Sequence, residues 1–139
     1  MLFYGGFVLA RRISSTFTEV ELEFMNIIWE QSEVTPLDIQ ITLEKSGREL
    51  SDGAIRRTLS ILMDKGHLTR RRFGLSFYYK AIERKDQSHK NMVMDLLKRG
   101  FGGSASQMVS ALLNTDGIKK DDLDEIKRLI KTREGEGLK

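Results

Sequence analysis

The chain has 139 residues, no cysteine and a formal net charge of only +3. This length allows one compact domain with an appendage but excludes two large cores. The absence of cysteine excludes disulfides, thiolate metal clusters and a thiol nucleophile. Hydrophobic residues at 40% and charged residues at 31% indicate a globular protein, for which we expect a cytoplasmic location.

The first sixteen residues are predicted to be a disordered arm. Residues 1–12 form an apolar stretch that ends in Arg11 and Arg12. This order is the reverse of a secretory signal, in which basic residues precede the apolar run, and the stretch is too short to span a bilayer. Contact of the arm with a membrane or with DNA is the alternative.

Three predicted helices follow, and each begins with a capping side chain between two apolar residues. Thr18 with Glu21 and Thr35 with Asp38 have the spacing of capping boxes. Ser51 is the expected cap of the third helix. The apolar pairs that can pack across these starts are Phe17 with Leu22, Val34 with Ile39, and Leu50 with Ile55. Because the connections are short, the second and third helices are predicted to form a helix-turn-helix pair.

The third helix is amphipathic. Ile55, Leu59 and Leu62 recur at helical spacing and are predicted to face the core. This arrangement turns Arg56, Arg57 and Ser60 outward. The third helix therefore has the basic and polar outer face expected of a recognition helix.

After Gly66, which ends the third helix, the pattern changes to β-branched and aromatic residues. Residues 68–73 and 77–82 are predicted strands, and residues 74–76 form the turn between them. Three helices followed by a β-hairpin make a winged helix, assigned to residues 17–83. Trp29 is predicted to pack in its core, and one of the neighbouring pair Tyr78 and Tyr79 is expected to do the same. The fold class is mainly α with a small β-hairpin.

Charge is unevenly distributed over this domain. Residues 17–34 carry five acids and no base, whereas residues 56–80 carry seven bases and one acid. Such a basic stretch indicates a phosphate-binding face; a solvated helix face and a charged edge strand are the alternatives. The predicted DNA-binding residues are Thr35, Ser51, Asp52, Arg56, Arg57, Ser60, Arg70, Arg71, Arg72 and Lys80.

Residues 84–133 are predicted to be a helical dimerisation region, and residues 134–139 a flexible tail. One helix is expected from about residue 84 to Gly100, another after the cap Ser104, and a last one after Gly117. Short helices with apolar stripes cannot bury them alone, so a second copy is the predicted partner. The expected dimer contacts are Met92, Leu96, Leu97, Met108, Val109, Leu112, Leu113, Leu123, Ile126, Leu129 and Ile130.

No set of residues assembles into a catalytic, cofactor or metal site, so the chain is not expected to be an enzyme or to bind a small-molecule substrate. His67 and His89 lack partners at metal-ligand spacing. The glycines at 100, 102 and 103 are interpreted as a helix break, not a phosphate loop. An acidic cluster is interpreted as favouring a helix dipole; it comprises Asp121, Asp122, Asp124 and Glu125.

The chain resembles the penicillinase-repressor (BlaI/MecI-type) family of winged-helix regulators from residue 17 to about residue 130. The resemblance is carried by five segments. They are FTEVE (17–21) leading to IWE (28–30), SDGAIRR (51–57), MDKGHL (63–68), FGGS (101–104) and MVSALL (108–113).

This resemblance implies a homodimeric transcriptional repressor that binds a palindromic operator, near genes for a membrane-bound sensor metalloprotease. The antibiotic-responsive members are cleaved at an Asn-Phe bond, and the matching positions here are Ala111 and Leu112, the candidate cleavage site. Copper-responsive relatives carry a cysteine pair that this chain lacks, which excludes metal sensing of that kind. A winged helix that binds a protein instead of DNA is the alternative function.

Overall fold

A computed structural model describes residues 16–137, which form two compact units. The predicted arm therefore lies outside the described residues except for Thr16. The first unit extends to Asp95 and the second begins at Leu96. This boundary lies within a helix, twelve residues beyond the predicted boundary between residues 83 and 84.

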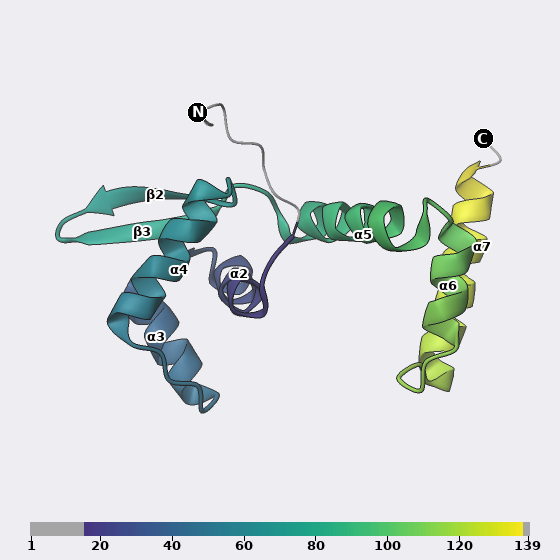
Figure 1. Cartoon of the computed structure of the whole chain (residues 1–139), viewed down its shortest axis with the longest axis horizontal. Helices are drawn as coiled ribbons and strands as arrows, with labels where there is room; N and C mark the ends of the chain where they lie inside the picture. The colour runs from purple at the N-terminus through teal and green to yellow at the C-terminus, as the bar shows by residue number, and fades with distance from the viewer. Residues whose placement is uncertain (1–15, 138–139) are drawn as a thin grey trace. The chain divides into compact units, whose positions relative to one another are not determined.

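In its described part, the first unit contains three helices, a three-stranded sheet and the start of a fourth helix; Figure 1 labels the helices and the two longer strands. Its elements are α2 (Glu19–Gln31), β1 (Glu33–Val34), α3 (Pro36–Lys45), α4 (Asp52–Asp64), β2 (Leu68–Phe73), β3 (Ser76–Ala81) and the first part of α5 (Lys85–Phe101). The predicted helix-turn-helix pair is α3 with α4, and β2 with β3 forms the wing.

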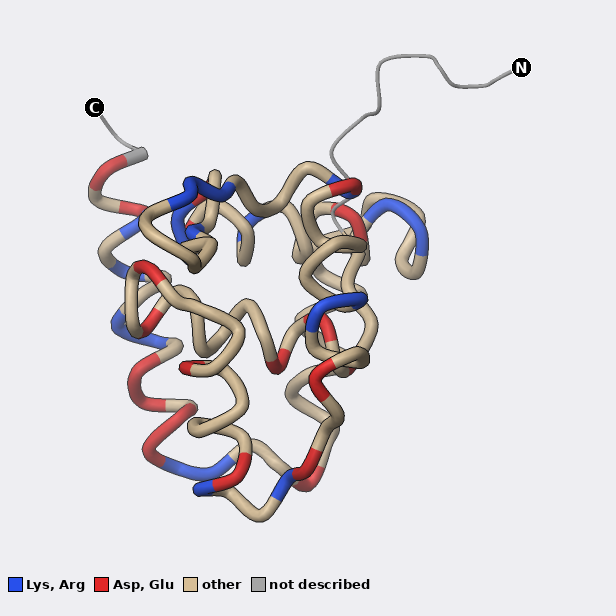
Figure 2. Tube along the Cα trace, turned by 90° about the vertical axis from the view of Figure 1, so that its left-hand side faces the viewer, with Lys and Arg blue, Asp and Glu red and all other residues tan. Residues whose placement is uncertain are grey.

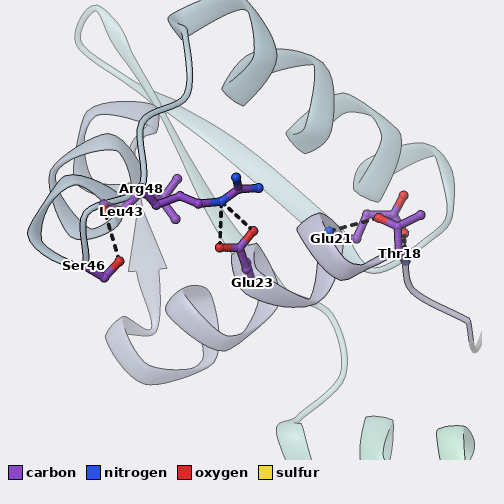
Figure 3. A network of polar contacts seen from close by, with 6 residues as sticks. All are labelled: Thr18, Glu21, Glu23, Leu43, Ser46 and Arg48. Atoms are coloured by element: carbon purple, nitrogen blue, oxygen red, sulfur yellow. Dashed lines mark hydrogen bonds and ion pairs between the residues drawn. The ribbon is translucent and has the colours of Figure 1, made fainter.

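The helix starts follow from local capping chemistry. The Thr18 hydroxyl accepts a hydrogen bond from Glu21 N at 3.1 Å, and the Glu21 carboxylate accepts one from Thr18 N at 3.1 Å (Figure 3). Thr35 and Asp38 form the same reciprocal pair at the start of α3. These two capping boxes and the Ser51 cap of α4 were predicted from sequence, and the structure confirms them.

The sheet has one strand more than predicted. The two-residue strand β1 pairs antiparallel with β3 and gives the sheet order β1-β3-β2. It lies in the connection between the first two helices, where no strand was predicted. Two residues are too few for a period-2 pattern. The second wing strand begins and ends one residue earlier than predicted.

One hydrophobic core holds the helices and the sheet of the first unit together. Phe24, Ile28, Ile39, Ile55, Leu59 and Leu62 are each at most 1% exposed. Tyr79 is also buried, which confirms that one tyrosine of the pair is in the core. Trp29 is partly buried against this core, and its indole Nε1 donates a hydrogen bond to the Glu83 carbonyl at 3.2 Å.

The second unit consists of the end of α5, α6 (Ala105–Leu113) and α7 (Lys120–Gly137). The Ser104 hydroxyl caps α6 as predicted. Gly100 was expected to end α5, but the helix continues through Phe101. It ends where Gly102 and Gly103 adopt positive φ values of 57° and 85° and Gly103 N donates a hydrogen bond to Leu97 O at 2.9 Å. At the other end, α7 includes residues 134–137 of the predicted tail.

Candidate nucleic-acid interface

The outer face of α4 carries the side chains predicted for a recognition helix. Ile55, Leu59 and Leu62 are buried, and Arg56, Arg57 and Ser60 are exposed. Because the apolar positions of α4 are buried and the basic and polar positions are exposed, as in an amphipathic helix, the predicted orientation of α4 is confirmed. The positions of the charged residues along the chain can be followed in Figure 2.

Two residues at the start of α4 interact across one helical turn. Arg56 Nε lies 2.9 Å from Asp52 Oδ2. Both side chains are largely exposed, so this pair adds little to stability. The contact places the Arg56 guanidinium beside the Asp52 carboxylate on the exposed face of α4. Arg57, one position further on, is exposed and forms no ion pair with a carboxylate of the described residues.

Backbone hydrogen bonding accounts for the two hydroxyl residues in the predicted DNA-binding set. The Ser51 hydroxyl accepts from Ala54 N at 3.1 Å, and the Thr35 hydroxyl accepts from Asp38 N at 3.1 Å. Ser51 is exposed at the start of α4, whereas Thr35 is only partly exposed at the start of α3. Each hydroxyl can still donate a hydrogen bond while it caps its helix.

The wing arginines divide between the two faces of the sheet. Leu68 and Tyr79 are buried, so they define the core face, and alternation places Arg70 and Arg72 on that face. Arg70 Nη1 donates to the Tyr79 hydroxyl at 3.2 Å, and its guanidinium lies 3.9 Å from the Phe77 ring centroid. Arg72 Nε donates to the Gly74 carbonyl at 3.3 Å. All of these partners are uncharged.

Arg71 lies on the opposite face, with an acidic partner from another strand. Its Nε and Nη2 donate to the two oxygens of Glu33 at 2.8 and 3.0 Å. The hydrogen bonds from Arg71 hold the pKa of Glu33 below its ordinary value, and the Lys80 charge acts in the same direction. Lys80 is the register partner of Glu33 on β3. The structure thus separates Arg71 and Lys80 from Arg70 and Arg72.

Glu33 is a residue of the candidate site that sequence reasoning missed. It lies 38 residues before Arg71, in a connection where no strand was predicted. Only the pairing of β1 with β3 brings the carboxylate to the wing. No local sequence pattern predicts a contact between residues this far apart. The sequence showed only that residues 17–34 are acidic.

The second unit presents apolar side chains to solvent. No residue of α6 is buried, and α7 also has no buried side chain among its described residues. The predicted dimerisation residues here include Leu112 at 47%, Leu129 at 51% and Ile130 at 52% exposure. Leu96, Val109, Leu113 and Leu123 are likewise exposed, and Leu97, Met108 and Ile126 are partly buried. The remaining predicted dimer contact, Met92, is partly buried in the first unit. The candidate cleavage residues Ala111 and Leu112 lie within α6.

The two histidines lie against aromatic rings. His67 is buried, and its ring centroid lies 4.4 Å from that of Phe17. His89 is exposed and meets Trp29 edge to face at 6.0 Å. Across residues 16–137, no three His, Asp or Glu side chains converge as metal ligands. Over the same residues, no helix has the length and hydropathy needed to cross a membrane.

The helix-turn-helix with its wing and exposed basic α4 defines a winged-helix transcription regulator. The family model described as penicillinase repressor matches residues 17–132. The chain belongs to the penicillinase repressor family, as its sequence motifs predicted.

Two curated relatives have the same description. The penicillinase repressor of Staphylococcus aureus is 22% identical over 110 residues, which cover 79% of this chain and 86% of that protein. The penicillinase repressor of Bacillus licheniformis is 26% identical over 118 residues, which cover 81% and 88%. A solved complex structure of hsRosR-S4 matches with a TM-score of 0.50 at 14% identity and covers 88% of this chain and 93% of that one. That likeness concerns the fold alone.

Proposed function

We propose that this repressor acts as a homodimer on a two-fold-symmetric operator in cytoplasmic DNA. The observation that carries the proposal is that the exposed basic face of α4 and the wing occur in one chain with the uncovered apolar faces of α6 and α7. A two-fold dimer presents two recognition helices, and these match the repeat of neighbouring major grooves when their separation is about one duplex turn, roughly 34 Å.

In this account α4 reads the operator. Arg57 is suited to bidentate hydrogen bonding with a guanine edge, and the Ser60 hydroxyl to an adaptable contact. Arg56, which is paired with Asp52, lies on the same exposed face of α4 and contacts the operator beside Arg57. Ser51, Thr35 and the wing arginines Arg70 and Arg72 contact the phosphate backbone, to which exposed helix N-termini and arginines are complementary.

A DNA-binding assay over a salt series tests the proposal. Promoter fragments retained by the protein from its own genome supply the specific duplex, and a scrambled duplex of equal length supplies the non-specific one. Arg57→Ala is expected to weaken specific binding by roughly 1–3 kcal/mol and non-specific binding much less. Arg128→Ala is the matched control, since Arg128 is an exposed arginine of α7 whose partner is Glu125.

Two results would contradict the proposal. Equal losses of affinity on both duplexes would make Arg57 a phosphate contact. If the chain bound no duplex but selectively bound another protein, a protein-binding winged helix would be favoured instead.

We also propose that repression is relieved by proteolysis at Ala111-Leu112, with a membrane-bound sensor metalloprotease as the partner. Cleavage there would cut α6 and separate α7 from the DNA-binding unit. Both residues are exposed, but they lie within a helix, so α6 must unwind locally before a protease can bind an extended segment. Mass spectrometry of the repressor from induced cells tests this proposal. Intact repressor at full induction would contradict it.

A further inference from the structure

We propose that Glu33 withholds Arg71 from DNA, so that the wing offers the phosphate backbone two arginines instead of three. The inference rests on the proposed DNA-binding function and refines it. It concerns the outer face of the wing, which comprises Glu33, Thr69, Arg71, Phe73, Tyr78 and Lys80.

The Arg71 guanidinium presents its Nε–Nη2 edge to Glu33, and this edge is one of the two through which arginine can bind a phosphate in bidentate fashion. Nε and Nη2 donate to the two Glu33 oxygens, a bidentate geometry that arginine also adopts with phosphate. The same guanidinium lies 5.0 Å from the Tyr78 ring centroid and 5.8 Å from that of Phe73. A phosphate could bind this fork only by displacing the carboxylate.

The charge of Arg71 is compensated, whereas that of its neighbours is not. Arg70 and Arg72 interact with a hydroxyl, a carbonyl and aromatic rings, and these partners leave a full positive charge available to DNA. Glu33 lies near Arg71 and is paired in register with Lys80. The formal charges of these three side chains on the outer face therefore add up to +1. The carboxylate stays ionised at neutral pH, since the hydrogen bonds from Arg71 lower its pKa.

The position of Glu33 gives the contact a second consequence. Glu33 is followed by Val34 and then by Thr35, the N-cap of α3. The ion pair therefore connects the wing to β1, two residues before the N-cap of α3, in addition to the backbone pairing of β1 with β3. Arg71 is accordingly a positioning residue for the wing.

The test uses the intact protein and a fluorescent duplex of random sequence, with binding followed by anisotropy between 50 and 200 mM salt. Each phosphate contact contributes about 0.9 to the slope of log K against log salt, so one contact multiplies the affinity loss over this range by about 3.5-fold. Arg71→Ala is expected to leave the wild-type slope unchanged. Arg70→Ala, the matched control on the same strand, is expected to reduce it by about 0.9.

Glu33→Gln supplies the opposite change. Freed from its carboxylate, Arg71 is expected to steepen the slope by about 0.9 and to raise affinity at low salt, and the double variant Glu33→Gln/Arg71→Ala is expected to return to the wild-type slope. A structural role alone would lower affinity without steepening the slope.

A slope that Arg71→Ala flattens as much as Arg70→Ala does, or that Glu33→Gln leaves unchanged, would overturn the inference. In either case DNA binding by the wild-type protein would still support the proposed function. Absence of wild-type binding to any duplex would overturn both.

Discussion

The two units differ in what holds them together. Every buried hydrophobic side chain of the described residues lies in the first unit, where α2, α3, α4 and the sheet enclose one core. In the second unit α6 and α7 bury no described side chain, and their leucines and isoleucines face solvent except for the partly buried Ile126. The first unit therefore has the core of an independent domain, whereas the second exposes apolar side chains that the proposed dimer would cover. Four changes test this difference.

The largest effect is expected from the core of the first unit. Leu59→Ala removes a side chain that is 0% exposed and should lower the free energy of unfolding by about 2–5 kcal/mol, because a cavity remains. Leu37→Ala is the control, since Leu37 is 61% exposed in the same unit, and it should change stability by less than about 0.5 kcal/mol. Urea unfolding followed by the fluorescence of the single tryptophan, Trp29, measures both. Similar losses in the two variants would contradict the assigned core.

A second change tests the exposed face of α7. Leu129→Gln should raise the dissociation constant of the dimer at least tenfold, which corresponds to about 1.4 kcal/mol. The effect is large because a two-fold dimer carries the substitution in both copies and loses the apolar contact at both. Lys127→Gln introduces the same residue at another exposed position of α7 and should leave association unchanged. Sedimentation equilibrium measures both constants. An unchanged constant for Leu129→Gln would remove this residue from the interface.

The third change tests the buried carboxylate of the first unit. Burial raises the pKa of Glu21, but hydrogen bonds from Lys65 and from Thr18 N outweigh it, so the pKa lies below the ordinary 4.5. Glu21→Gln should lower the free energy of unfolding by about 1–2 kcal/mol at pH 7, since Lys65 Nζ loses a charged partner at 2.7 Å.

The pH dependence of this third effect has a definite sign. Because the folded-state pKa is depressed, the ionised carboxylate stabilises the native state above pH 4.5, and this contribution is lost as the pH falls through the folded value. Wild type and Glu21→Gln should therefore converge in urea titrations at acidic pH. A difference that stays constant as the pH is lowered would contradict the assigned role of the charge.

The smallest effects are expected at helix caps. Thr35→Ala removes the hydroxyl that accepts from Asp38 N and should cost about 1 kcal/mol in the unfolding transition of the first unit. Ser104→Ala removes the matching cap of α6 and should shift the Trp29 transition by less than about 0.5 kcal/mol, because Trp29 reports on the other unit. Equal shifts would indicate that the two units unfold together.

Local signals in the sequence were sufficient for the helices and for the wing. The caps at Thr18, Thr35, Ser51 and Ser104 depend on residues three positions apart, and such spacings can be read directly. The end of α5 was misjudged because Gly100 adopts a helical conformation, and the backbone reverses only at Gly102 and Gly103. Which of several glycines ends a helix depends on φ values that composition does not report.

The candidate site was predictable in its exposure but not in its ion pairs. The amphipathic period of α4 correctly placed Arg56, Arg57 and Ser60 outside. Alternation along a strand also follows from the sequence, and it places Arg71 on the face opposite Arg70 and Arg72, as the register of β2 with β3 has it. The partner of Arg71 was not predictable, because Glu33 reaches it only through the pairing of strands that are distant in sequence.

Sedimentation equilibrium of the intact wild-type chain tests the central claim most directly. If a second copy covers the apolar faces of α6 and α7, the mass at micromolar concentration should be twice the 15.9 kDa of the chain, and a saturated operator duplex should carry two copies. A mass of one chain throughout this concentration range, together with one copy per duplex, would contradict it.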